Sequence, residues 1–191
     1  RLDILFRNGL QGLALVLILL FVFLSARTAF WVAAGIPAAL FAAIGIMFIS
    51  GLTINMISLF ALIICLGIVV DDAIVVGEHA DFRLRRLGEN PEEAAERGAT
   101  RMALPVFTAT ITTVIAFAGL VVVGGRFGSL IADIPFTVIA VLIASLLECF
   151  LVLPNHMAHA LRQKVLKKKW YDWPSDKFNI VFRIFRENLF R

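Results

Sequence analysis

Residues 56–77 read MISLFALIICLGIVVDDAIVVG, an apolar run whose only charged members are Asp71 and Asp72. A helix needs about 20 apolar residues to cross the ~30 Å hydrocarbon core of a bilayer, and this run is long enough. It also lacks the alternation of apolar and polar residues that is typical of a membrane β-strand. The stretch therefore predicts a transmembrane helix with two acidic residues in its interior.

Four further stretches of the chain have the same character. Together with the first they predict five spans, over residues 9–26, 30–49, 56–77, 103–125 and 134–153. Of the 191 residues, 60% are hydrophobic and 17% are charged, whereas a soluble domain has roughly 25% charged residues. This composition excludes an ordinary soluble enzyme domain, a disordered tail and a secreted disulfide scaffold. We therefore expect an all-α membrane protein, a polytopic bundle of five transmembrane helices.

Lysine and arginine are unevenly distributed between the two sides of such a bundle. One side would hold Arg1, Arg7 and Arg126, and the other would hold fifteen, nine of them from Arg162 to Arg191. The positive-inside rule then predicts that the N-terminus lies outside and the C-terminus lies in the cytoplasm. Because these basic residues flank apolar runs and no recognition motif accompanies them, we expect no nucleic-acid partner.

Two helices are expected outside the spans. The sequence NPEE at residues 90–93 supplies an N-cap, a proline at the first helical position and two acids, so it predicts a short cytoplasmic helix that Gly98 can end. Residues 162–191 are basic and carry apolar side chains at helical spacing, which predicts an amphipathic helix on the lipid surface. A linker to a following domain fits that pattern equally well. The chain thus divides into a five-span segment, residues 1–161, and a cytoplasmic basic segment, residues 162–191.

Asp71 and Asp72 are costly residues for a membrane helix. Each costs about 2.5–3.5 kcal/mol at the centre of a span, so stability alone does not explain the pair. Desolvation and mutual repulsion disfavour the charged forms, and we expect the two groups to bind protons as a coupled unit. Neighbours on a helix point about 100° apart, so the two side chains should face different partner helices. The alternative is a structural ion pair, whose basic member would lie elsewhere because the five spans contain no interior lysine or arginine.

Gly67, Asp71 and Asp72 form a G-x-x-x-D-D motif that resembles the N-terminal half of resistance-nodulation-division transporters. The resemblance is to their hydrophobe/amphiphile efflux branch, and it covers nearly the whole chain. Four segments carry it, and these are residues 52–55 (LTIN), 71–78 (DDAIVVGE), 104–107 (LPVF) and 153–156 (LPNH).

The resemblance implies proton-driven export of drugs or other amphiphiles through the bacterial inner membrane, by a secondary active transporter and not an enzyme. It implies a homotrimer docked to a periplasmic adaptor and an outer-membrane channel, with the proton gradient as energy source and no cofactor. Asp71 and Asp72 would be the proton relay, paired with a lysine from a second half of the polypeptide. The five spans would be the second to sixth of six, with the N-terminus periplasmic, and the drug-binding periplasmic domain would lie outside this segment of a longer protein.

For the other polar residues in the spans, the sequence gives weaker evidence of a functional role. Thr108 and Thr112 lie one helical turn apart. We expect their hydroxyl groups to hydrogen-bond to their own helix or to pack between helices. The alternative is a hydroxyl relay that leads protons to the carboxylates. Glu148 is an acid inside the last span, and such a residue is a candidate second proton site. His156 and His159 lack a third ligand, so we expect no metal. Cys65 and Cys149 lie inside apolar runs and should be buried free thiols.

Other functions remain open for the same pattern. Relatives with this motif also move lipids or sterol-like molecules, or assist protein secretion. An intramembrane aspartyl protease would need two carboxylates on different helices, and Glu148 is the sole conceivable second acid. A membrane scaffold would leave two buried acids unexplained.

Overall fold

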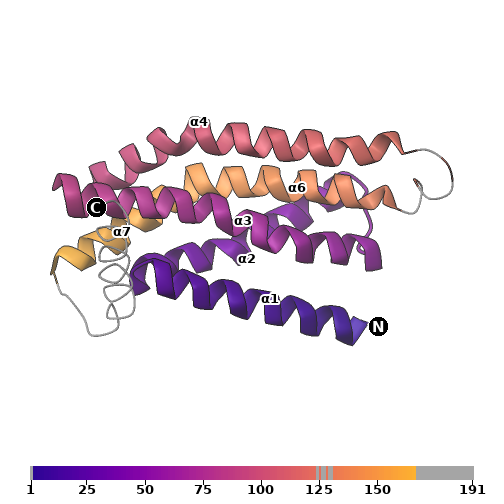
Figure 1. Cartoon of the computed structure of the whole chain (residues 1–191), viewed down its shortest axis with the longest axis horizontal. Coiled ribbons are helices and arrows are strands. Elements are labelled where there is room, and N and C mark those ends of the chain that lie inside the picture. Colours follow the sequence, from indigo (N-terminus) through magenta and orange to yellow (C-terminus); the bar gives the residue numbers. More distant parts are fainter. Residues whose placement is uncertain (1, 124, 126–127, 129–130, 167–191) are drawn as a thin grey trace, which may run out of the picture.

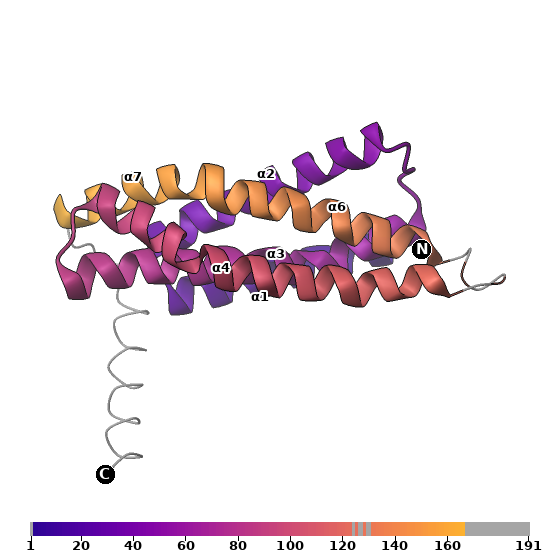
Figure 2. The same cartoon turned by 90° about the horizontal axis from the view of Figure 1, so that it is seen from above.

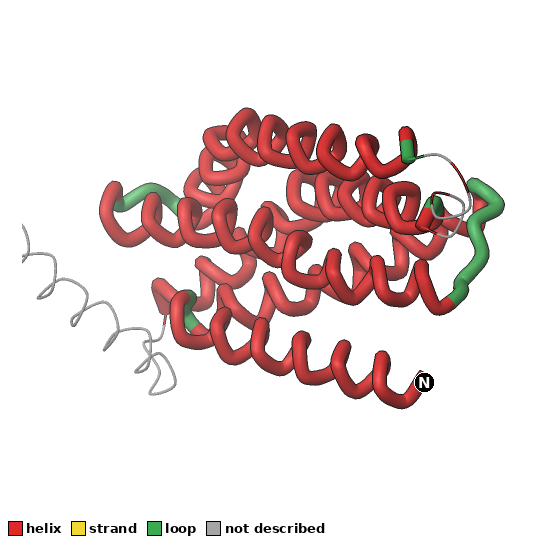
Figure 3. Tube along the Cα trace, turned by 45° about the vertical axis from the view of Figure 1, so that its right-hand side comes forward, coloured by secondary structure: helices red, strands yellow, loops and turns green. Residues whose placement is uncertain are grey.

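The computed structural model describes residues 2–123, 125, 128 and 131–166, and within these ranges every regular element is a helix (Figures 1 and 3). Three short turns of π- or 3₁₀-helix continue longer α-helices. The elements are α1 (Leu2–Phe23), α2 (Ala26–Ile49), α3 (Met56–Phe82), η1 (Arg83–Leu87), α4 (Pro91–Ala118), η2 (Gly119–Val122), α6 (Asp133–Leu147), η3 (Glu148–Val152) and α7 (Leu153–Leu166).

Five of the helical rods are long and apolar enough to cross a membrane, which confirms the predicted fold class for the described part of the chain. They span Asp3–Phe23, Ala26–Ile49, Met56–Leu87, Pro91–Val122 and Asp133–Arg162. Successive rods run in opposite directions (Figure 1). Of the expected amphipathic helix at residues 162–191, residues 162–166 continue α7, and residues 167–191 lie outside the described residues.

The last rod passes through a proline. Figure 2 shows α6 and α7 as one continuous rod joined by the π-turn η3, and Pro154 is its second residue after that turn. Proline lacks an N–H and its ring clashes with the carbonyl four residues earlier, which here belongs to Phe150 in η3. The wider π-turn relieves this conflict, so the helix continues to Leu166 where the sequence analysis ended the span at residue 153.

The expected short helix at residues 91–98 is not a separate element. Asn90 and Pro91 begin a helix as predicted, but that helix is α4, and it runs without a break through Gly98 to Ala118. Gly98 is buried against Ala80 of α3, where an added Cβ would lie 2.9 Å from the Ala80 Cα. The glycine therefore allows two helix backbones to approach closely and does not end a helix.

The bundle has two buried apolar clusters, and one of them forms around α6, which packs between α2 and α3. Val138, Val141 and Leu142 of α6 are fully buried there among small residues of its neighbours. Cys65 and Cys149 are both buried and free, as predicted. Small side chains at the contacts are typical of membrane bundles, since helix association in lipid depends on close packing.

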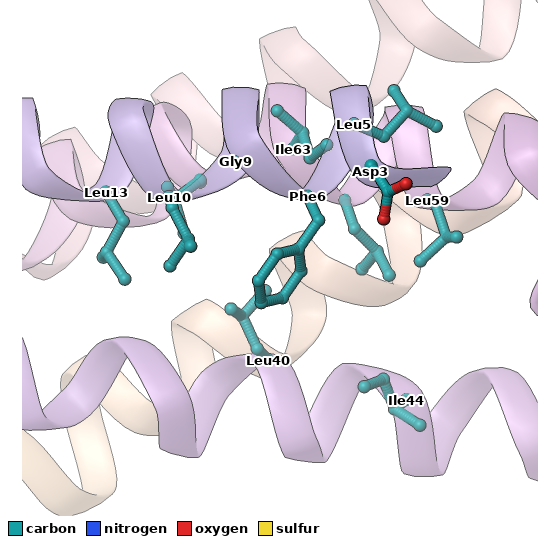
Figure 4. A pocket seen from close by; sticks show the side chains of 12 residues that line it. Asp3, Leu5, Phe6, Gly9, Leu10, Leu13, Leu40, Ile44, Leu59 and Ile63 are labelled. Carbon is teal, nitrogen blue, oxygen red and sulfur yellow. The ribbon is translucent and has the colours of Figure 1, made fainter. Parts of the chain in front are cut away.

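Helix α1 lies at the edge of the bundle and exposes most of its large apolar side chains (Figure 1). Between α1 and α2 runs an apolar groove of about 570 Å³ with α3 as its floor. In Figure 4 Phe6 of α1 points toward Leu40 of α2, while Leu59 and Ile63 come from α3. The weak attachment of α1 contrasts with the dense packing of α6.

Ion pairs hold the turn between α3 and α4. Arg83 donates to Glu89 through Nε (2.8 Å) and Nη2 (2.5 Å), and Arg97 Nη1 donates to the same carboxylate at 3.2 Å. Arg162 of α7 pairs with Glu92 at the start of α4. We call this side of the bundle the basic end, which comprises residues 24–28, 83–101 and 156–162.

The opposite end of α3 is fixed by Asn55. Its Oδ1 accepts from the backbone N–H groups of Ile57 (2.8 Å) and Ser58 (3.0 Å), and the Ser58 hydroxyl accepts from the Asn55 N–H at 2.8 Å, which completes a capping box. Asn55 Nδ2 also donates to Asp133 Oδ2 at 2.5 Å, so the N-termini of α3 and α6 are joined. The helix that carries the acid pair is therefore anchored at both ends.

Replacing Gly98 with alanine tests the close contact of α3 and α4. Alanine favours a helix by about 1 kcal/mol over glycine, but overpacking costs about 1–3 kcal/mol, so we expect Gly98→Ala to lower the thermal unfolding midpoint in detergent. Gly45→Ala is the matched control, because a Cβ there meets nothing within 4 Å. An equal or higher midpoint for Gly98→Ala than for Gly45→Ala would contradict the packing assignment.

The Glu89 cluster predicts a pH-dependent turn. Hydrogen bonding from Arg83 lowers the pKa of Glu89, so its stabilising effect is complete above the ordinary glutamate pKa of about 4.3 and is lost as the pH falls through the lowered value. Amide hydrogen exchange at residues 87–90, corrected for intrinsic rates, should show protection that falls under acid conditions. Glu89→Gln should remove this pH dependence, and an unchanged pH profile in that variant would refute the assignment.

Candidate functional site

The acid pair lies in the uninterrupted middle of α3. Helices α1, α2, α4 and α6 all contact α3, which places the pair inside the bundle and not on an isolated helix. The residues on either side of the pair, Val70 and Ala73, are buried. Asp71 and Asp72 thus stand at the border between the buried and open faces of α3.

The two carboxylates face different surroundings, as the 100° step between helix neighbours predicts. Asp71 is exposed and lines a groove of about 530 Å³ formed by α1, α3 and α4. Val16 and Leu19 of α1 and Thr113 of α4 form the other walls near it. Asp72 is half-buried, and its Oδ2 has no hydrogen-bond partner among the described residues.

Gly67 lies one helical turn before Asp71 and lines the same groove. A Cβ added at Gly67 would meet nothing within 4 Å, so the glycine is not required for packing inside the described bundle. Its bare surface leaves room beside the Asp71 carboxylate. A side chain or helix from outside this chain could occupy that space.

Helix segment η3 lies against α3 at the level of the acid pair. The Cys149 thiol donates to the backbone carbonyl of Asp72 with an Sγ–O distance of 3.7 Å. Thiol hydrogen bonds are weak, so this contact shows where η3 packs on α3 and adds little stability of its own. Glu148, the preceding residue, is thereby brought close to the acid pair in the fold.

Glu148 is the most deeply buried carboxylate of the described residues, with 6% of its surface exposed. Its carboxyl group lies on the backbone of Gly35 in α2, where an added Cβ would come within 2.7 Å of the Glu148 Cδ. The Oε1 atom has no hydrogen-bond partner in the described part of the chain. The sequence identified Glu148 as a candidate, but not the glycine that makes room for it.

The threonines of α4 bond to their own helix. Thr108 Oγ1 donates to the carbonyl of Leu104 and Thr112 Oγ1 to that of Thr108, each at 2.9 Å. Thr113, which lines the Asp71 groove, donates to the carbonyl of Ala109 at 3.1 Å. A hydroxyl relay through Thr108 and Thr112 stays a prediction, and Thr113 is the threonine that shares a groove with an aspartate.

His156 and His159 have different environments. The His156 ring stacks on Trp31 of α2 with centroids 4.6 Å apart, and its Nδ1 is buried without a partner among the described residues. His159 is exposed, with Nδ1 3.0 Å from the carbonyl of Asn155. The described ranges contain no group of three or more potential metal ligands. The stack on Trp31 was not foreseen, because nothing in the sequence pairs α2 with α7.

Residues 3–189 match the profile of the AcrB/AcrD/AcrF family, which is nearly the whole chain. The chain belongs to this family. The resemblance to resistance-nodulation-division transporters, drawn from the motif residues, is therefore confirmed.

Several AcrB/AcrD/AcrF relatives are multidrug resistance proteins named MdtC. That of Yersinia enterocolitica is 33% identical over 164 residues, which cover 85% of this chain and 16% of the relative. Those of Pantoea ananatis and Escherichia coli O139:H28 are 32% and 34% identical, over 79% and 75% of this chain and 15% and 14% of the relative. The chain thus spans about 15% of the length of the relatives it matches.

Proposed function

We propose that this chain is the proton-translocating membrane segment of a proton-driven multidrug exporter, in which Asp71 and Asp72 bind and release the transported proton. One observation carries the proposal. Two adjacent carboxylates occupy the middle of a membrane-length helix, one open to a groove and one turned inward, and neither forms an ion pair within the described ranges. No packing role inside the bundle accounts for both.

The asymmetry of the pair suits this role. Removing a carboxyl group from water costs much free energy when the group is charged and little when it is protonated. Its charge therefore depends on whether a compensating group lies opposite it. Asp71 can receive a compensating group through the groove that Gly67 leaves open, and the family resemblance supplies a lysine of the second half as that group. A shift of the helices that withdraws this group would favour protonation, and its return would favour release. The conformational change and the proton are thereby coupled.

The orientation follows from the basic end. Basic side chains gather at the turns that close this side of the bundle, including Arg27, Arg83, Arg97 and Arg162. We assign this end to the cytoplasm and the Asn55–Asp133 end to the periplasm, in a bacterial inner membrane.

In this proposal, the other parts of the exporter are supplied by regions outside this chain. A periplasmic domain would select the cargo, and a second membrane half would complete each subunit of a homotrimer that docks to an adaptor and an outer-membrane channel. Drugs are the cargo best supported, because the relatives are named as multidrug resistance proteins.

Neutralising either aspartate in the full-length protein should stop export. Asp71→Asn and Asp72→Asn keep size and polarity but cannot carry a proton, so efflux of a fluorescent drug from cells should fall to the level of cells without the protein. Glu96→Gln, an exposed acid of α4, is the matched control and should export normally. Membrane content and oligomeric state are measured alongside. Efflux by both aspartate variants at the unaltered rate would refute the proposal.

A further inference from the structure

We propose that Glu148 is a second proton-binding site, placed at the seam between α2 and the rod formed by α6, η3 and α7. This inference rests on the proposed function, because a second proton has a use only if the protein is driven by protons. The site is separate from the groove of Asp71, which is bounded by α1, α3 and α4.

The first argument is the burial of Glu148. Its side chain is 6% exposed, its Oε1 lacks a hydrogen-bond partner among the described residues, and no ion pair to it is present in the same ranges. An uncompensated carboxylate in such a place is strongly disfavoured, whereas the protonated acid can remain. A group whose charge the surroundings control in this way is suited to taking up and releasing a proton.

The second argument is that the fold provides space for the carboxyl group. Gly35 is the position on α2 that faces it, and an alanine there would place its Cβ 2.7 Å from the Glu148 Cδ. Glu148 also begins the π-turn η3, a feature that in helices is frequently found at functional sites. The glycine opposite therefore provides the space that the buried carboxyl group occupies.

The third argument is the link to the acid pair. Cys149, next to Glu148, donates to the backbone carbonyl of Asp72, so η3 contacts the middle of α3 directly. Asp72 Oδ2 is itself buried without a partner in the described structure. Protonation of Glu148 therefore acts on the helix segment that carries Asp72.

Unpartnered polar atoms also lie on α2 and α7 at the basic end of the bundle. Arg27, Trp31 and Gly35 are spaced four residues apart on α2 and so lie along one face of that helix. His156 of α7 stacks on Trp31, and both His156 Nδ1 and Arg27 Nη1 are buried without partners among the described residues.

The charged and titratable groups around Glu148 are few. Asp72 comes from α3, Cys149 and His156 come from the rod itself, and Arg27 comes from α2. The last charged residue of α4 is Arg101, which acts on His79, about two turns beyond Asp72. Any pH dependence assigned to Glu148 must therefore be separated from Asp72 and His156.

The test is proton binding by the purified full-length protein, measured by potentiometric titration across the neutral pH range. Glu148→Gln should bind about one proton fewer per chain than the unaltered protein, since a single titrating group has been removed. The same difference should appear in an Asp72→Asn background and in a His156→Gln background, which separates Glu148 from both neighbours. Glu96→Gln should leave the neutral range unchanged.

A second variant covers the case in which Glu148→Gln does not fold. Gly35→Ala keeps the acid but displaces its carboxyl group, so the infrared band of a protonated carboxyl should shift and the pH of half-maximal export should move. Gly45→Ala on the same helix meets nothing within 4 Å and should change neither.

Identical titration curves for Glu148→Gln and the unaltered protein would overturn the inference, and so would equal infrared spectra for Gly35→Ala and Gly45→Ala. These results would leave the proposed function intact if the aspartate variants still lose export. Normal export by the aspartate variants would instead overturn the proposed function.

Discussion

A carboxylate that has been removed from water must find a compensating charge or hold a proton. This constraint governs the middle of the bundle, where Asp72 and Glu148 each present a buried oxygen without a partner among the described residues. Ion pairs at Glu89 and a capping box at Asn55 hold the two ends of α3. Because neither acid has a compensating charge in the described ranges, the charge state of the centre is free to change.

Small residues decide how the helices close around these acids. Gly98 brings α4 against Ala80, and Gly35 leaves room on α2 for the Glu148 carboxyl group. Gly67 does the opposite, because it faces open space beside Asp71. The glycines thus serve two purposes: Gly35 and Gly98 allow close packing inside the bundle, and Gly67 leaves open space in the groove that Asp71 lines.

The sequence predicted the number and type of spans because length and hydrophobicity are local properties of the chain. It also predicted that the two aspartates diverge, since helix period alone requires this. It could not tell that Gly98 is a packing residue, because a glycine near a helix end reads equally as a stop. The placement of Glu148 on Gly35, and of His156 on Trp31, depends on which helices become neighbours, and one sequence does not contain that information.

Transport in proteoliposomes that contain the full-length protein tests the central claim most directly. A pH gradient is imposed while the membrane potential is held at zero, and the movement of a drug is followed. The account predicts that the drug moves against the proton flow, reverses with the sign of the gradient and stops when a protonophore is added. Drug movement at the same rate without a gradient, or in the presence of the protonophore, would contradict it.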